Sequence, residues 1–329
     1  MAMQHEAILY SLDPKITLWQ TKDFVDYDTN KYIKLQNRIT EQQVCAVMDT
    51  DEDLHYKFLA IRPKVHFFYY LGKLSLLNHK ILGIVWPRAM SNYGKKILEE
   101  LFTFASDHDF ITVSGMAEGI DQLCHQFSHE HNIPTIAVLG WGLGWYLKRP
   151  EREIIEQIVA DGGLVISEYK LGERPTQYTF PQRNRIIAWL ADVLFLPEAW
   201  EKSGSLITVD FAIAMKKPVY ATPNSIFAPT SAGIVQLMET GHVKPICNLK
   251  TFLSTHFTSK TTSSRPQHTL ILSDQEQSLL SVLSRDQWVE IASLMQTTGA
   301  DLQEIIQLLT MLEIKWLVVQ EVPGKYCLV

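Results

Sequence analysis

The chain has 329 residues, a mass of 37.7 kDa and a mean hydropathy near zero, with 46% hydrophobic and 20% charged residues. Its length predicts roughly two or three domains, and its composition excludes collagen, coiled coils and long disordered segments. Lys and Arg number 30 against 36 Asp and Glu, a net charge of −6. This balance excludes a strongly basic coat for nucleic acid, but not a local basic groove.

Cysteine usage and hydropathy indicate the compartment. The four cysteines are Cys45, Cys124, Cys247 and Cys327, and no two of them form a CxxC pair. Such spacing argues against a zinc ribbon or a disulfide scaffold and favours a reducing compartment. The N-terminus shows no signal-peptide pattern, and no apolar run approaches the ~20 residues that span a bilayer. We expect a soluble cytoplasmic protein with no membrane contact, no metal and no cofactor.

In chain order, residues 1–79 come first, and amphipathic stretches such as Asp28–Met48 predict an N-terminal, mostly helical region there. Residues 80–250 alternate short apolar runs with helix-like segments. The expected strands are Ile81–Val85, Phe110–Ser114, Thr135–Leu139, Gly163–Ser167, Val193–Pro197 and Pro218–Ala221; the expected helices are Tyr93–Asp107, Ile120–His131, Pro150–Asp161, Arg183–Leu190 and Ser205–Met215. This alternation predicts an α/β domain with a doubly wound, mostly parallel sheet, in which ligands bind at the carboxyl ends of the strands.

A change of composition marks the C-terminal part. Ser and Thr residues with one proline and no apolar period predict a linker over residues 251–269. Residues 270–329 then form a separate small domain. This domain carries 3 basic and 8 acidic side chains, so 3 − 8 = −5 of the net charge is concentrated there.

The first candidate ligand loop follows the Phe110–Ser114 strand. Ser114, Gly115 and Gly119 stand at a strand-to-helix turn, where glycines let a backbone approach a ligand closely and the helix start offers free N–H groups. Tight packing of a helix on a strand explains the same pattern equally well. Asp121 is either a helix cap or a ligand group.

The second candidate loop precedes the Val193–Pro197 strand. Arg183, Asn184 and Arg185 open the expected helix, and Phe180 lies three residues before Arg183. Two cations at a helix N-terminus oppose the helix dipole, which favours a functional role. Arg suits phosphates and Phe offers a stacking face to a base. The alternative is a structural salt bridge from Arg183 or Arg185 to Glu168.

A third loop follows the Val193–Pro197 strand. Lys202, Ser203, Gly204 and Ser205 lead into an apolar helix, which makes a second anion-receptive helix start. Ser205 as a plain N-cap is the alternative. These loops would converge on one edge of one sheet, and that convergence is more specific than any single loop.

Over residues ~80–245 the chain resembles the DprA/Smf family of DNA-processing proteins. The matching strings are SGMAEGID (114–121), TIAVLG (135–140), GGLVISEY (162–169), FPQRNRIIA (180–188) and SGSLITVDFA (203–212), in family order. His125 falls where the family has a histidine, and Arg88 and Ser91 match its first-strand turn. The string around FPQRNRIIA is the most specific of these.

The resemblance implies an extended Rossmann-like core that binds single-stranded DNA without catalysis. It further implies protection of incoming DNA in natural transformation, loading of a RecA-type recombinase and a homodimer. Phosphates would meet Arg88, Arg183, Arg185 and Lys202, and Phe180 would stack on a base. The loops at 114–119 and 203–205 would supply N–H donors.

The resemblance also implies a C-terminal winged-helix-like domain. Its helices would be Ser273–Ser284, Trp288–Met295 and Asp301–Leu312, and its wing strands Trp316–Glu321 and Gly324–Val329, with Pro323-Gly324 as the turn. Phosphate neutralisation dominates DNA affinity, so an acidic module is a poor DNA binder by itself. We favour a protein contact or a dimer aid for this domain.

Departures from the family pattern concentrate in the turn after the first strand. Trp86 replaces a glycine and Pro87 replaces a hydroxyl residue. Pro has no N–H donor and Trp blocks close backbone approach, so a phosphate cradle built from amides should be weakened here. Trp86 either stacks on a base or simply packs.

The sequence favours a binding protein over an enzyme. Related phosphoribohydrolases carry a catalytic glutamate where this chain has Thr208, and a threonine cannot act as a carboxylate base. His125, His129 and His131 have no acidic partner at ligand spacing, so we interpret them as histidines of a surface helix. The alternative functions are a nucleotide-binding sensor or a residual glycosidic hydrolase, and a structural partner with a decayed site.

Overall fold

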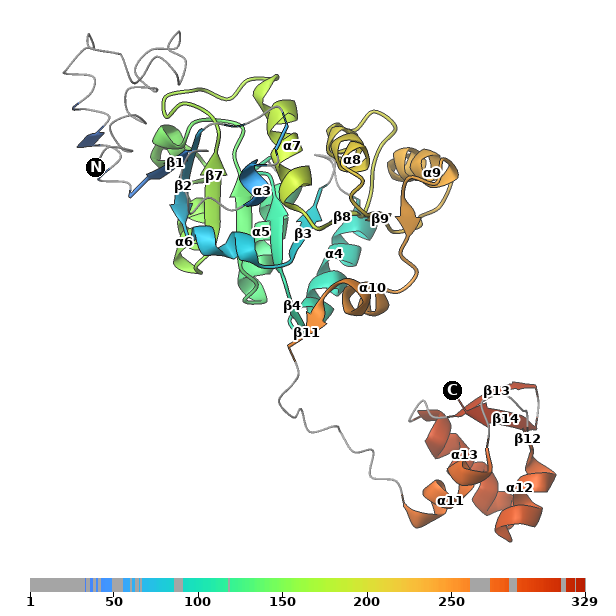
Figure 1. Ribbon diagram of the computed structural model, residues 1–329. Coiled ribbons are helices and arrows are strands. Elements are labelled where there is room, and N and C mark those ends of the chain that lie inside the picture. Colours follow the sequence, from blue (N-terminus) through green and yellow to red (C-terminus); the bar gives the residue numbers. More distant parts are fainter. Residues whose placement is uncertain are drawn as a thin grey trace. The chain divides into compact units, whose positions relative to one another are not determined.

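The structure, a computed structural model, contains two compact units, residues 1–260 and 261–329 (Figure 1). It describes residues 33, 36, 37, 40, 43–48, 56–59, 61, 62, 65, 67–85, 91–117, 119–260, 273–283, 289–314, 318–322 and 324–328. The expected turn with Trp86, Pro87 and Arg88 lies outside the described residues, as does residue 118. Among the helices that the structure describes, none combines the length and apolar character that a membrane span requires.

A nine-stranded sheet forms the centre of the first unit. The strand order is β1-β2-β7-β6-β5-β3-β8-β9-β10, and all pairs from β7 to β10 are parallel. The parallel strands are β3 Ile81–Ile84, β5 Ile111–Ser114, β6 Thr135–Val138, β7 Leu164–Ser167, β8 Val193–Leu196, β9 Val219–Ala221 and β10 Lys244–Pro245. The strands β3, β5, β6, β7 and β8 are buried along their whole length because helices cover both faces of the sheet. The predicted doubly wound, mostly parallel fold is confirmed.

Helices pack on both faces of this sheet. The apolar side chains of α3 Tyr56–Leu59, α7 Thr179–Leu190, α8 Gly204–Ala214 and α9 Ala232–Glu239 share one core with the sheet. Those of α4 Asn92–Ala105, α5 Ile120–Glu130, α6 Arg152–Ala160 and α10 Leu249–His256 pack on the other face. Side chains alternate between the faces along each strand: Ile81 packs with the α7 face, and Leu82 packs with α4.

The N-terminal region differs from the expected mostly helical segment. Its described part adds β1 Cys45–Met48 and β2 Phe67–Gly72 to the sheet, both antiparallel to their neighbours. Phe67 and Tyr69 pack on one side of β2 and Phe68 packs on the other, so the strand is buried on both faces, and β1 forms the edge of the sheet beside it. The expected Asp28–Met48 helix therefore does not extend to Met48.

The expected linker over 251–269 also begins too early. Residues 251–256 belong to α10, and β11 Thr258–Ser259 pairs with β4 His108–Asp109. Three apolar side chains anchor this segment: Phe252 and Leu253 are buried, and the ring of Phe257 stacks 4.5 Å from Phe110. The Ser/Thr-rich composition predicted a linker because these three apolar residues are few among the polar ones.

The second unit has three helices and a three-stranded antiparallel sheet. The helices are α11 Asp274–Val282, α12 Ile291–Thr298 and α13 Leu302–Ile314, and the strands are β12 Val289–Glu290, β13 Val318–Val322 and β14 Lys325–Leu328 in the order β12-β14-β13. The described elements follow the expected segments within three residues, except that Val289–Glu290, expected in the second helix, form the strand β12. Leu279, Leu294 and Leu309 belong to a core of this unit. The description as a winged helix stays a prediction.

Candidate nucleic-acid interface

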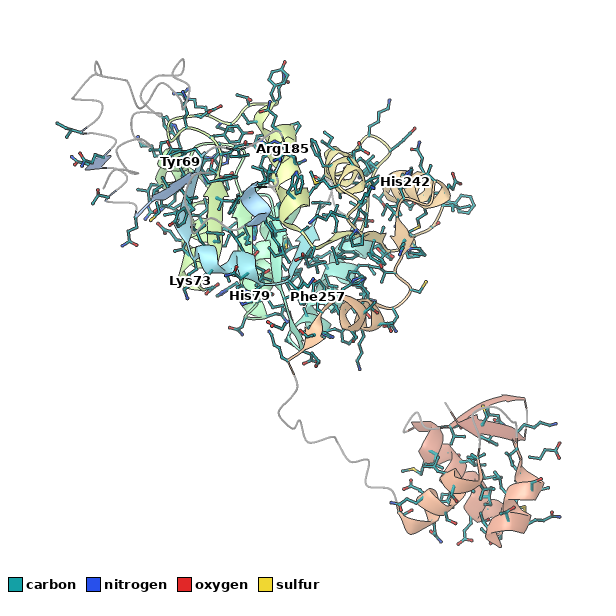
Figure 2. The ribbon with its side chains drawn as sticks, viewed as in Figure 1. Tyr69, Lys73, His79, Arg185, His242 and Phe257 are labelled. Carbon is teal, nitrogen blue, oxygen red and sulfur yellow. The ribbon has the colours of Figure 1, made fainter. Side chains whose placement is uncertain are left out.

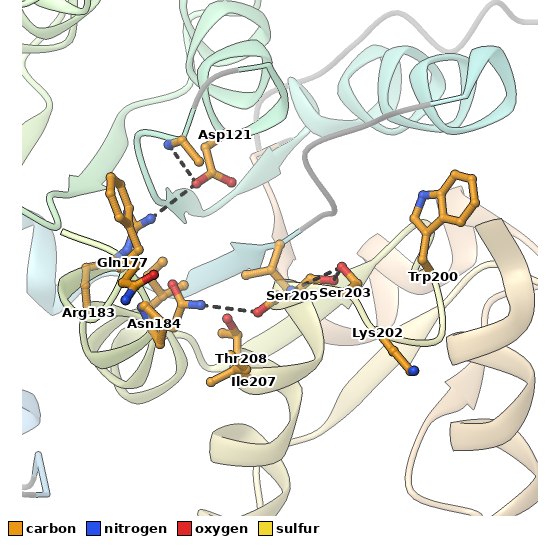
Figure 3. A pocket seen from close by; sticks show the side chains of 16 residues that line it. Asp121, Gln177, Arg183, Asn184, Trp200, Lys202, Ser203, Ser205, Ile207 and Thr208 are labelled. Atoms are coloured by element: carbon orange, nitrogen blue, oxygen red, sulfur yellow. Dashed lines mark hydrogen bonds and ion pairs between the residues drawn. The ribbon is translucent and has the colours of Figure 1, made fainter. Parts of the chain in front are cut away.

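A pocket of about 500 Å³ opens where the strand order reverses (Figure 3). β3 is flanked by β5 on one side and by β8 on the other, so the chain leaves this point in opposite directions. Such a switch point is where doubly wound sheets bind ligands. The lining comes from the carboxyl ends of β3, β5 and β8 and from the starts of α7 and α8: Val85, Ala117, Asp121, Gln177, Phe180, Pro181, Arg183, Asn184, Ile187, Trp200, Lys202, Ser203, Gly204, Ser205, Ile207 and Thr208.

Arg183 and Asp121 lie together on one side of the pocket (Figure 3). Arg183 is 3% exposed; its Nη1 donates to the Val138 carbonyl, and its Nη2 lies 3.6 Å from Asp121 Oδ2. A Cβ atom on Gly115 would lie 2.1 Å from both Arg183 Nη1 and Asp121 Oδ2, so only glycine leaves room for this ion pair. The charge of Arg183 is thus largely compensated inside the protein.

The position of Arg185 in α7 directs it into the interior. Because α7 begins at Thr179 and not at Arg183, both arginines stand in its second turn, away from the N-terminus. Arg185 is 8% exposed and donates from Nη2 to Glu168 Oε2. Burial raises the pKa of the Glu168 carboxyl, and the neighbouring Arg185 opposes this rise. The structural ion pair to Glu168 is therefore present, and Arg185 makes it.

The start of α8 forms the other wall of the pocket. Ser203 is the N-cap, and its Oγ accepts from the Ser205 N–H at 3.2 Å and contacts Ser205 Oγ at 2.7 Å. Asn184 Nδ2 donates to the Gly204 carbonyl at 3.4 Å, which ties α7 to this turn. Gly204 is exposed, and a Cβ atom placed on it would meet nothing within 4 Å. Since Ser203 accepts from the N–H groups of Ser205 and Leu206, the start of α8 offers an anion the exposed Gly204 and the positive end of the helix dipole.

Exposed cationic and aromatic groups complete the pocket. Lys202 is exposed beside the α8 start, and Trp200 is 40% exposed on the same side (Figure 3). Across the pocket, the half-buried Phe180 ring lies 5.9 Å from the Arg183 guanidinium. One cation, two aromatic faces and a helix N-terminus converge, which is the composition of a site for a phosphate joined to a base.

The predicted site residues divide into two groups. Phe180, Arg183, Asn184, Lys202, Ser203, Gly204 and Ser205 line the pocket. Ser91, Ser114, Gly115, Gly119 and Arg185 are described by the structure but do not line it. The hydroxyl of Ser91 donates to Glu198 Oε1 at 2.5 Å, and the hydroxyl of Ser114 donates to the Ile84 carbonyl at 2.8 Å. Arg88 lies outside the described residues.

His125 supports the loop beneath the pocket. Its Nε2 lies 2.7 Å from the Gly115 carbonyl and its Nδ1 2.8 Å from Thr135 Oγ1. Because a carbonyl only accepts, Nε2 carries the proton and Nδ1 accepts from the Thr135 hydroxyl. Burial lowers the pKa of this 2%-exposed imidazole to about 4, so it is neutral at pH 7. His125 was expected on a surface helix, and that placement is wrong because the ring faces the sheet.

The other histidines of α5 lie outside the pocket lining. His129 Nδ1 contacts Asp161 Oδ2 at 2.8 Å, and the His131 ring lies 5.9 Å from Phe102. Asp161, at the end of α6, is an acidic partner that the spacing in sequence does not show. Within the described part of the chain, no group of three His, Cys, Asp or Glu side chains could hold a metal ion.

Several pocket residues escape sequence reasoning. Gln177, Trp200 and Thr208 line the pocket without having been predicted as site residues. Asp121, predicted as a helix cap or a ligand group, accepts from the Ala117 N–H at 3.1 Å and is the partner of Arg183. Trp200 has a usable signal, because it lies in the loop that follows the buried strand β8, at the carboxyl edge of the sheet. The Arg183–Asp121 pair has none, because the two residues lie on different helices.

The sequence of residues 46–256 matches the model of the family DNA recombination-mediator protein A. DNA processing protein DprA of Streptococcus pneumoniae is 36% identical over 173 residues, which cover 53% of this chain and 61% of that protein. Protein Smf of Escherichia coli is 34% identical over 172 residues, 52% of this chain and 46% of that protein. The matched segment thus spans less than two thirds of either relative.

Two solved structures resemble this one. DNA processing protein A from Streptococcus pneumoniae has a TM-score of 0.60 at 28% identity, covering 78% of this chain and 94% of that one. The protein of the same name from Helicobacter pylori, which binds single-stranded DNA, has a TM-score of 0.56 at 26% identity, covering 65% of this chain and 95% of that one.

Proposed function

The chain belongs to the DNA recombination-mediator protein A family, and we propose from the geometry of its pocket that it binds single-stranded DNA there. The resemblance to DprA/Smf predicted from the motifs is confirmed, since the family model covers residues 46–256, well over half of the chain. The observation that carries the proposal is the convergence of Lys202, the open start of α8 and the Phe180 ring on one pocket at the switch point.

In this proposal each wall of the pocket has a separate role. A backbone phosphate lies against the first turn of α8, where the N–H groups and the helix dipole meet an anion, and Lys202 supplies the positive charge. A base stacks on Phe180. Arg183 forms part of the floor of the pocket, and its ion pair with Asp121 fixes its position. The Helicobacter pylori relative, which binds single-stranded DNA, supports this ligand class.

The pocket supports a non-catalytic role. The carboxylate among its described lining residues is Asp121. Asp121 accepts from the Ala117 N–H at 3.1 Å and lies beside the Arg183 guanidinium, with the Ser114 hydroxyl oxygen 3.3 Å away. These contacts engage the carboxylate within the protein, so it is poorly placed to act as a general base. Thr208 stands where the related phosphoribohydrolases carry a catalytic glutamate, and its side chain is 1% exposed.

The resemblance supports a wider role in recombination. We propose that the bound strand is protected and passed to a RecA-type recombinase during natural transformation, and that the protein acts as a homodimer. Two tests apply to these proposals: nuclease digestion of oligonucleotide with and without the protein, and sedimentation of the full chain.

A second candidate function rests on the size of the pocket. About 500 Å³ is within the range of small-ligand sites and would hold a mononucleotide. A sensor of this kind would be stabilised by nucleotides and would not bind oligonucleotides. Thermal shifts with a nucleotide panel, run beside oligo-dT, separate the two functions.

The direct test is a titration of oligo-dT at two salt concentrations. Lys202→Ala should weaken binding and make the slope of log K against log salt less negative by about 0.7, the contribution of one phosphate contact in a single strand. The matched control is Lys73→Ala, because Lys73 is exposed at the opposite edge of the sheet from Arg185 (Figure 2). Unchanged affinity of the Lys202 variant, or an equal loss in the control, would contradict the proposed site.

A further inference from the structure

A cluster of aromatic and cationic side chains lies beside the pocket on the loops after β6 and β7. Two cations contact the Trp145 ring: Lys148 Nζ at 5.7 Å and Arg174 Cζ at 5.4 Å from its centroid. Trp145 Nε1 donates to the Gly172 carbonyl at 2.7 Å, which fixes the indole between the two loops. We call Trp145, Lys148 and Arg174 the loop cluster.

The positive charges of the loop cluster are uncompensated within the described residues. Both Lys148 and Arg174 are exposed, and neither has a carboxylate within 4 Å in the part of the chain that the structure describes. The nearby acids are engaged elsewhere: Glu151 accepts from Arg149 at 2.7 and 3.0 Å, and Glu173 accepts from the Lys170 N–H at 3.3 Å. Two like charges held on one ring repel each other, so an anion stabilises the arrangement.

The loop cluster is continuous with the pocket. β6 and β7 are parallel to β5 and β3, so their following loops stand on the same carboxyl edge of the sheet. Arg174 precedes the pocket residue Gln177 by three positions, a span of at most ~11 Å for an extended backbone. Tyr178, which is 70% exposed, lies between Gln177 and Phe180.

We propose that the loop cluster is a second contact for the strand that leaves the pocket, with Lys148 and Arg174 on its phosphates. The occupant is single-stranded nucleic acid, because the cluster offers both cations and an aromatic ring and adjoins a site of the same character. The strand therefore runs from α8 across Phe180 toward β6, not toward β9. This inference rests on the proposed function of the pocket and gives the bound strand a direction.

The test compares two lengths of oligo-dT on the full-length protein. An oligonucleotide of about 5 nucleotides fills the pocket only, and one of about 20 nucleotides also reaches the loop cluster. The double variant K148A/R174A should bind the long strand about tenfold more weakly, with a salt slope less negative by about 1.4, and the short strand with unchanged affinity. K148R/R174K retains both charges and should bind both strands like the wild type.

The matched control is K73A/K80A, which removes two exposed lysines from the amino edge of the sheet and changes the net charge equally. An equal loss in this control, an equal loss on the short strand, or no loss on the long strand would overturn the inference and leave the pocket proposal standing. Failure of the wild type to bind either strand would overturn the pocket proposal itself, and the inference with it. Thermal unfolding of each variant checks that the fold is intact.

Discussion

The arginines of α7 and the cations on the loops at the same edge of the sheet differ in their exposure to solvent. Arg183 and Arg185 come from the most specific motif of the chain, yet both are buried and paired with carboxylates. Lys148, Arg174 and Lys202 belong to no such motif, yet all three are exposed. The arginines of this motif therefore belong to the buried support of the pocket, while the charges available to a ligand stand on the exposed loops around it.

The largest effect is expected when Arg183 is replaced, which tests whether this arginine stabilises the fold or binds the ligand. Arg183→Gln should lower the free energy of unfolding by about 3–5 kcal/mol, because it leaves Asp121 buried without its cation. Urea unfolding of the full chain measures this loss. The control is Arg152→Ala, which breaks an exposed i,i+4 pair with Glu156 and should unfold like the wild type.

The double variant Arg183→Gln with Asp121→Asn separates the pair from the site. Removing both charges should recover part of the lost stability, because no unpaired buried charge remains. If Arg183→Gln unfolds like the wild type while oligo-dT binding collapses, Arg183 acts on the ligand and not on the frame.

The second prediction concerns the neutral imidazole under the pocket. The pKa of His125 falls from 6.5 to about 4 on folding because the ring is buried, so protonation favours the unfolded state. The stabilisation is complete above pH 6.5 and is lost as the pH falls toward 4; a shift of 6.5 − 4 = 2.5 in pKa corresponds to about 3 kcal/mol.

Chemical unfolding at several pH values tests this assignment. His125→Gln cannot titrate, and its stability should depend less on pH between 6.5 and 4 than that of the wild type. His242→Gln, at an exposed position, is the control and should keep the wild-type dependence. Parallel pH curves for the His125 variant and the wild type would show that another group titrates in this range.

The sequence predicts the strands of the central sheet better than the residues of the candidate site. Six of the parallel strands lie within one residue of the expected segments at each end, because strands buried on both faces read as short apolar runs, whereas β10 Lys244–Pro245 was not predicted. β2 was missed, although Phe67, Phe68 and Tyr69 form such a run, because no helix of the βαβ kind flanks it. The expected helix begins at Arg183, whereas α7 begins four residues earlier, at Thr179, with Pro181 in its first turn, where a proline is tolerated.

That shift explains why the role of the arginines could not be read from the sequence. At the N-terminus of a helix both would face a ligand, whereas in the second turn they share the buried face with Ile186 and Ile187. The partners Asp121 and Glu168 come from other elements, and only the folded sheet brings them within contact. Residues that contact across elements need the tertiary structure.

The third prediction tests whether the Phe180 ring stacks on a base of the bound strand. Phe180→Leu keeps an apolar side chain beside Gly140 but removes the aromatic face, and a base–aromatic stack contributes about 1–3 kcal/mol. Affinity for oligo-dT should fall about tenfold with an unchanged salt slope, because no phosphate contact is lost. Fluorescence anisotropy measures both quantities. Phe104→Leu, on α4 outside the pocket, is the control; an equal loss in the two variants would point to general destabilisation.

The smallest expected effect comes from the acidic second unit. Its segment 270–329 carries 3 − 8 = −5 charges, which repel a phosphate backbone, and its helices form a core of their own. Deleting residues 261–329 should therefore leave the affinity for oligo-dT within about threefold of the wild type, with a slight gain at low salt as the repulsion disappears. A tenfold loss would mean that this unit contacts the strand despite its charge, and that exposed cations at the sheet edge are not the whole of the binding surface.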